Sequence, residues 1–83
     1  MPHDERAVAD IGGQIQQYLN EHPDAADTAA GIRDWWLAST LMARPALDAV
    51  QAALDTLVAR GLVARRDRPG MPPIYRQARR NKE

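Results

Sequence analysis

The sequence contains no cysteine, which excludes a disulfide framework and thiolate chemistry. No apolar run approaches the length of a membrane span, and the first ten residues, MPHDERAVAD, are too polar for a secretory signal. These absences predict a protein of the reducing cytoplasm that has no membrane association.

Groups that converge in catalytic sites are also scarce. The two histidines, His3 and His22, lie near opposite ends of the first predicted helix, too far apart to share a metal. Asp24 and Asp27 precede a helix, where aspartates ordinarily act as caps. Phosphate-loop and dinucleotide glycine motifs are absent. We therefore expect no enzymatic activity, no metal, no cofactor and no small-molecule substrate.

Large apolar side chains are few. There is no phenylalanine, and fifteen of the apolar residues are alanine. A chain of 83 residues with this composition predicts one domain with a thin core and marginal stability, or stability gained from a partner chain. We place the domain at residues 1–76 and a basic, disordered tail at 77–83, where the sequence QARRNKE has no apolar periodicity.

The net charge of zero hides an asymmetry along the chain. Residues 1–43 carry a net charge of −5, and residues 44–83 carry +5. Eight of the basic residues fall at or after the end of the third predicted helix: Arg60, Arg65, Arg66, Arg68, Arg76, Arg79, Arg80 and Lys82. Such a patch is typical of a polyanion site, although exposed hairpins and tails are also made basic for solubility.

Apolar spacing predicts two helices in the acidic half. The first spans Asp4 to Asn20, with Asp4 as its N-cap, and carries an apolar face of Val8, Ile11, Ile15 and Leu19. Gly12 and Gly13 indicate either a bend or the close approach of another segment. Thr28 caps the second helix, expected over Ala29 to Ser39.

Two adjacent tryptophans, Trp35 and Trp36, fall on this second helix. Neighbouring helical residues point about 100° apart, so both rings cannot occupy the centre of one narrow apolar face. The favoured interpretation is a wide face that buries both rings. The alternative leaves one ring exposed, as an anchor for a partner protein.

The third helix and a hairpin organise the remaining chain. A helix of about sixteen residues is expected, with Pro45 in its first turn and Gly61 just past its end. Its apolar face consists of Leu47, Val50, Leu54, Leu57 and Val58. One extended segment begins at Leu62, and a second covers 74–76. The Arg-Pro-Gly sequence at 68–70 predicts a turn between them, so the two segments are expected to form a β-hairpin.

A helix ending in Arg-Gly-Leu-Val and followed at once by a basic hairpin resembles the third helix and wing of winged helix-turn-helix domains. The resemblance implies a mainly α fold with a small β-wing, in the order α-(β)-α-α-β-β, with a short first strand within 24–28. The connection Ala38 to Arg44 is longer than the usual three- or four-residue turn.

This resemblance implies duplex DNA as the partner and transcription regulation as the role. We expect the wing to contact phosphates or the minor groove through Arg65, Arg66, Arg68 and Arg76, and helix three to reach base edges through Arg44 and Gln51.

A winged helix that binds protein, in a homodimer or a larger complex, is the alternative, because the outer face of helix three is small and acidic. That face includes Ala49. The candidate interface is Trp35, Asp48, Ala52 and Asp55.

Overall fold

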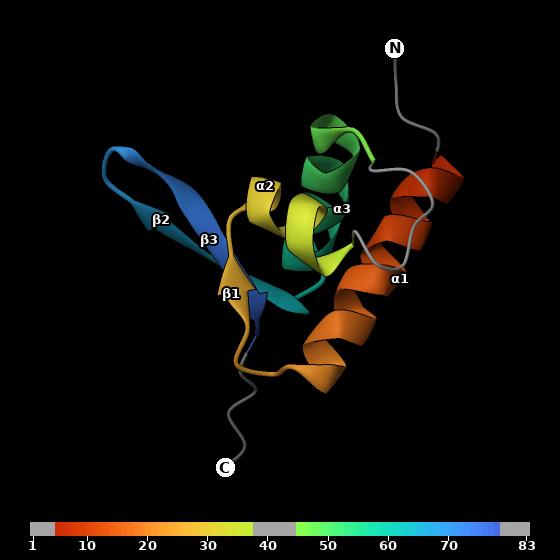
Figure 1. The fold of residues 1–83 in the computed structure, drawn as a ribbon, viewed down its shortest axis with the longest axis horizontal. Helices are drawn as coiled ribbons and strands as arrows, with labels where there is room; N and C mark the ends of the chain where they lie inside the picture. The colour runs from red at the N-terminus through yellow and green to blue at the C-terminus, as the bar shows by residue number, and fades with distance from the viewer. Residues whose placement is uncertain (1–4, 38–44, 79–83) are drawn as a thin grey trace.

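The computed structural model describes residues 5–37 and 45–78 (Figure 1). Within them, three helical segments pack beside a three-stranded antiparallel sheet, forming a small α+β domain compatible with a winged-helix-like arrangement. The elements are α1 (Glu5–Glu21), β1 (Ala26–Asp27), α2 (Ala29–Gly31), the π-helix η1 (Ile32–Trp36), α3 (Leu47–Ala59), β2 (Val63–Arg68) and β3 (Met71–Gln77).

Helix α1 runs without interruption through its two glycines, and buries Ile11, Ile15 and Leu19 as expected. A Cβ added at Gly12 would lie 3.9 Å from a Leu57 methyl group, an ordinary contact distance, so α3 packs beside this part of α1 without requiring a glycine there. The expected cap, Asp4, lies outside the described residues.

The second helical segment differs from its prediction. Thr28 caps it as expected, because its Oγ1 accepts a hydrogen bond of 3.1 Å from the Gly31 N–H. The helix predicted from Ala29 is present, but only its first three residues are α-helical and a π-helix follows over Ile32–Trp36; its predicted end at Ser39 lies outside the described residues. The Leu37 N–H donates to the Ile32 carbonyl oxygen at 3.1 Å, which closes the wider i to i+5 turn.

The two tryptophans in this segment have opposite environments. Trp36 is 5% exposed and stacks on Tyr18, with ring centroids 4.6 Å apart and planes 10° from parallel. Trp35 is 75% exposed. The favoured prediction that both rings are buried is therefore wrong, and the alternative of one exposed ring is confirmed.

Helix α3 begins later than predicted and ends where predicted. Ala46 is its N-cap, so Pro45 precedes the cap and is not in the first turn. Gly61 adopts a φ of 77°. Its N–H bonds to the Val58 carbonyl and the Leu62 N–H bonds to the Leu57 carbonyl, which is the paired hydrogen bonding of a glycine-terminated helix.

The buried face of α3 is rotated from the predicted one. Val50, Leu54 and Leu57 are buried as expected, but Leu47 is 38% exposed and Val58 is half-buried. Two small residues replace them in the core: Ala49 and Ala53. The burial of Ala49 corrects its assignment to the outer face of the helix.

The sheet has the strand order β1-β3-β2, and its hairpin extends away from the helices (Figure 1). The short first strand expected within 24–28 is present as β1, which pairs with β3. At the hairpin tip, Gly70 has a φ of 71° after Pro69. Strand β3 includes Gln77, which corrects its assignment to the tail, and residues 79–83 lie outside the described part.

Candidate binding surfaces on the hairpin and α3

The predicted wing arginines lie on two faces of the hairpin. Arg65 pairs with Tyr75, whereas the next residue, Arg66, pairs with Ile74. Arg76 pairs with Ala64 and therefore lies on the same face as Arg66, diagonally across the two strands. Both of these side chains are exposed. We call Arg66 and Arg76 the outer pair.

Arg65 lies on the side of the sheet that carries Tyr75 and is bound within the hairpin. Its Nε donates a 2.9 Å hydrogen bond to Oδ1 of Asp67, forming an ion pair. This bond and the carboxylate charge raise the pKa of Arg65, with smaller contributions from Tyr75 and Asp55. An incoming phosphate would compete with Asp67 for this guanidinium.

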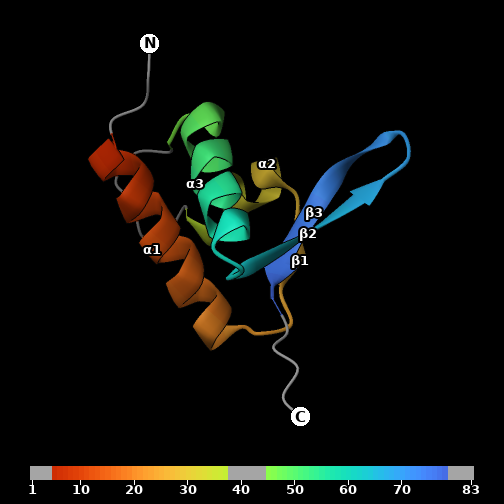
Figure 2. The same cartoon turned by 180° about the vertical axis from the view of Figure 1, so that it is seen from behind.

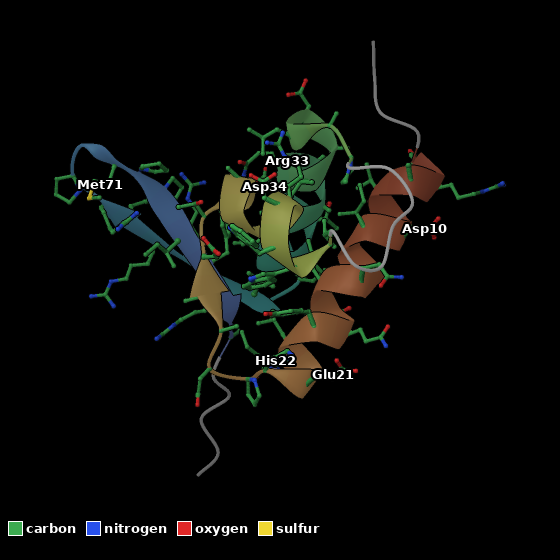
Figure 3. The ribbon with its side chains drawn as sticks, viewed as in Figure 1. Asp10, Glu21, His22, Arg33, Asp34 and Met71 are labelled. Atoms are coloured by element: carbon green, nitrogen blue, oxygen red, sulfur yellow. The ribbon has the colours of Figure 1, made fainter. Side chains whose placement is uncertain are left out.

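Arg68 is held at the hairpin tip in a different way. Its Nε and Nη2 donate to the carbonyl oxygen of Pro72, at 3.2 and 2.9 Å. A carbonyl is neutral, so these bonds orient the guanidinium without cancelling its charge. Figure 3 shows Met71 at the same tip, far from Arg33 and Asp34 on the second helical segment.

Gln51 joins α3 to the sheet. Its amide nitrogen donates to the Tyr75 hydroxyl at 2.7 Å and to Oδ1 of Asp55 at 3.1 Å, and Tyr75 is 1% exposed. Both amide hydrogens thus have acceptors within the protein. The local sequence pattern indicates no partner for Tyr75, although a buried tyrosine hydroxyl usually requires one.

The outer face of α3 remains acidic in the structure. Asp48 and Asp55 are exposed, and Ala52 is half-buried. The Thr56 hydroxyl donates to the Ala52 carbonyl oxygen at 3.0 Å. The helix contains no lysine or arginine, and Arg44, the cation expected before it, lies outside the described residues.

The charge asymmetry persists in the folded chain. Residues 60–78 carry five arginines and one aspartate, a net charge of +4. Residues 5–37 carry two arginines and six carboxylates, a net charge of −4. Although α1 and the hairpin lie on opposite sides of α3 (Figure 1), β1 pairs with β3, so the acidic and basic parts meet in the sheet, where Ala26 lies opposite Arg76.

A groove of about 550 Å³ lies between α1 and α3, which run side by side in Figure 2. Six of its ten lining residues are small or apolar, and the other four are polar or charged. The lining residues are Glu5, Val8, Ala9, Gly12, Gly13, Gln16, Ala53, Thr56, Leu57 and Arg60.

Neither a metal cluster nor a membrane span occurs within residues 5–37 and 45–78. These residues contain no group of three or more histidine or carboxylate side chains arranged to hold a metal ion. None of the described helices is both long and apolar enough to cross a membrane.

Comparison with protein-family models, curated proteins and solved structures finds no match to this chain.

Proposed function

We propose that this chain is a winged-helix domain that binds duplex DNA through phosphate contacts from its hairpin. The order of its elements and the strand order β1-β3-β2 support the winged-helix assignment. In this proposal the hairpin is the wing.

The observation that carries the proposal is the net charge of +4 on residues 60–78, together with the exposure of the outer pair. Arg66 and Arg76 lie diagonally on one face of the hairpin, where two guanidinium groups can reach a phosphate backbone together. Arg68 adds a cation whose position is already set by the Pro72 carbonyl, so little side-chain entropy is lost when it binds.

Base readout by α3 has less support than phosphate contacts by the hairpin. Gln51 already donates both amide hydrogens within the protein, and Asp48 and Asp55 would face the negative charge of a phosphate backbone. Phosphate contacts carry no sequence information by themselves. The proposed role is therefore general or architectural DNA binding rather than recognition of one operator.

A salt titration of binding to random-sequence duplex DNA tests this proposal. Replacing both arginines of the outer pair with glutamine should weaken binding to all duplexes alike. It should also flatten the slope of log K against log salt by about 0.9 for each phosphate that the variant no longer neutralises, or roughly 1.8 in total.

Arg65→Gln is the matched control, because it removes one arginine from the same strand but from the opposite face, where Asp67 already pairs with it. Its effect on the slope should be smaller than half that of the double variant. Absence of duplex binding by the unmodified chain at low salt would contradict the proposal.

A second candidate function is protein binding through the outer face of α3, favoured by the two exposed carboxylates beside Ala52. Asp48→Asn separates the two functions. If α3 approaches the duplex, removing this charge should strengthen DNA binding. If the face binds a protein instead, affinity for DNA should remain unchanged.

A further inference from the structure

We propose that the outer edge of β2 binds an extended, acidic segment of another protein, which adds to the three-stranded sheet as a further strand. The proposal rests on the backbone groups that this edge exposes and on the charges beside them. It does not depend on the proposed DNA binding, because no contact with nucleic acid is involved.

The strand order leaves one edge of β2 open. In the order β1-β3-β2, its one neighbour among the described strands is β3, so every second residue of β2 directs its N–H and C=O groups away from the sheet. The Ala78 N–H donates to the Leu62 carbonyl oxygen at 3.2 Å, which makes these two residues a hydrogen-bonded pair just before the strand. Continuing the register by steps of two, the backbone groups of Ala64 and Arg66 also face β3.

The backbone groups of Arg65 and Asp67 point the other way, toward the open edge, because these residues alternate with the inward-facing ones. Past the register shift, Arg68 pairs with Met71, which keeps Asp67 between two inward-facing residues. Arg65 and Asp67 are both exposed, and the hairpin extends away from the helices (Figure 1). This stretch can therefore pair with the backbone of another chain.

Proline closes the opposite edge of the hairpin. On that side, Tyr75 of β3 pairs with Asp27 of β1, and two residues along β3 the same edge reaches Pro73. Proline has no N–H, so it cannot donate to an added strand. The neighbouring Pro72 carbonyl oxygen already accepts two hydrogen bonds from Arg68. Strand β2 contains no proline, and its edge therefore keeps the donors that the β3 edge lacks.

The side chains of β2 determine the charge of the strand that fits. Three arginines and one aspartate give β2 a net charge of +2. Adjacent residues of a strand point to opposite faces, so Arg65 and Arg66 place a guanidinium on each face of the sheet. An added strand therefore meets a cation on either face. Carboxylates opposite these arginines form stabilising cross-strand ion pairs.

A second copy of this chain is a poorer occupant of the edge. Pairing β2 with β2 of another copy would place two strands of charge +2 side by side, a combined charge of +4. Like charges directly opposite each other destabilise a sheet. The arginines thus oppose self-pairing through this edge, as edge charges commonly do, and favour an acidic strand in its place.

The chain itself contains an acidic strand at the other edge of the sheet. Residues 24–27 read Asp-Ala-Ala-Asp, and the last two form β1. Ala26 lies opposite Arg76 of β3, so this acidic segment adds to the sheet beside a member of the outer pair. An acidic partner strand at β2 would repeat this arrangement on the other side of the hairpin.

Binding of a short acidic peptide tests the proposal. The probe is a fluorescently labelled peptide of sequence Glu-Thr-Glu-Glu-Val-Thr with blocked ends, titrated with the full chain and followed by fluorescence anisotropy. One short strand covers far less than the roughly 800 Å² per partner of a stable complex, so we expect a Kd on the order of 100 µM. The same peptide N-methylated at every amide keeps its carboxylates but cannot donate to β2, and it should bind about tenfold more weakly.

Two substitutions at Asp67 separate backbone pairing from charge. Asp67→Asn and Asp67→Pro remove the same carboxylate, but only proline also removes the outward N–H. Since that N–H does not face β3, Asp67→Pro should keep the hairpin, as circular dichroism can verify. Charge alone predicts that both variants bind the acidic peptide more tightly than the parent. Edge pairing predicts tighter binding by Asp67→Asn, and binding by Asp67→Pro that is about tenfold weaker than by Asp67→Asn.

Random-sequence duplex DNA is the control ligand. Loss of the carboxylate that pairs with Arg65 should strengthen DNA binding equally in both variants, since phosphate contacts from arginine side chains do not use the β2 backbone. If the chain binds no DNA, the peptide comparison is unaffected, so the two proposals can fail separately.

Three outcomes would overturn the proposal: no peptide binding by the parent chain at about 1 mM, equal affinity for the plain and N-methylated peptides, or equal affinity of the two Asp67 variants for the plain peptide. The first two need no variant, so they apply even if Asp67→Pro does not fold. A parent chain that dimerises in sedimentation equilibrium, and that Asp67→Pro makes monomeric, would also overturn it by assigning the edge to a second copy.

Discussion

The helical segments and the hairpin differ in which side chains they bury and which they expose. Within the described residues, every buried core residue except Val63 and Tyr75 comes from the helical part, Ile11 to Leu57. The hairpin instead carries four of the seven arginines in the described residues and exposes the outer pair. The contrast implies that changes in the helices act mainly on stability, whereas changes in the hairpin act mainly on binding.

The largest effect on stability should come from the centre of α3. Leu54 is fully buried, so Leu54→Ala removes apolar contacts and leaves a cavity. It should lower the free energy of unfolding by about 2 to 5 kcal/mol, measured by thermal or denaturant unfolding. In so small a domain this loss could prevent folding. A midpoint within a few degrees of the parent would contradict the core assignment.

A smaller loss is expected where the two parts of the chain meet. Gly61 ends α3 with a φ of 77°, a conformation that costs an L side chain about 1 to 2 kcal/mol. Gly61→Ala should therefore lower the unfolding midpoint by several degrees. Gly13→Ala is the matched control, because Gly13 lies within a helix and its substitution should raise the midpoint. Equal shifts in both variants would contradict this account.

The hydrogen bond between Gln51 of α3 and Tyr75 of β3 should contribute about 1 kcal/mol to the free energy of unfolding. Tyr75→Phe keeps the buried ring but removes the hydroxyl that accepts from the Gln51 amide. Denaturant unfolding should show a modest loss with an unchanged m-value. A loss of stability as large as that of Leu54→Ala would show that the hairpin is as important to the core as the helices. That result would contradict the division into stabilising helices and a binding hairpin.

The smallest effect on stability is expected at the outer pair. Changing Arg66 and Arg76 to glutamine should leave the free energy of unfolding within about 0.5 kcal/mol of the parent, since both side chains are exposed. The same variant is the one expected to bind duplex DNA more weakly. A large change in stability together with weaker binding would remove the distinction between a stabilising and a binding region.

Local features of this fold could be predicted from the sequence because they depend on near neighbours. Thr28 caps a helix through a residue three positions away, and Gly61 and Gly70 permit left-handed backbone where the chain reverses. The separation of acidic and basic charge is likewise a property of the chain itself. The DNA-binding role drawn from these features stays a prediction.

Only the tertiary structure decided which side chains are covered and which share a surface. Periodicity placed two tryptophans side by side, but stacking on Tyr18 and the wider π turn buried Trp36 and left Trp35 exposed. The pairing register placed Arg65 on one face of the hairpin and the outer pair on the other. Burial and register depend on partners distant in sequence, so local patterns alone do not determine them.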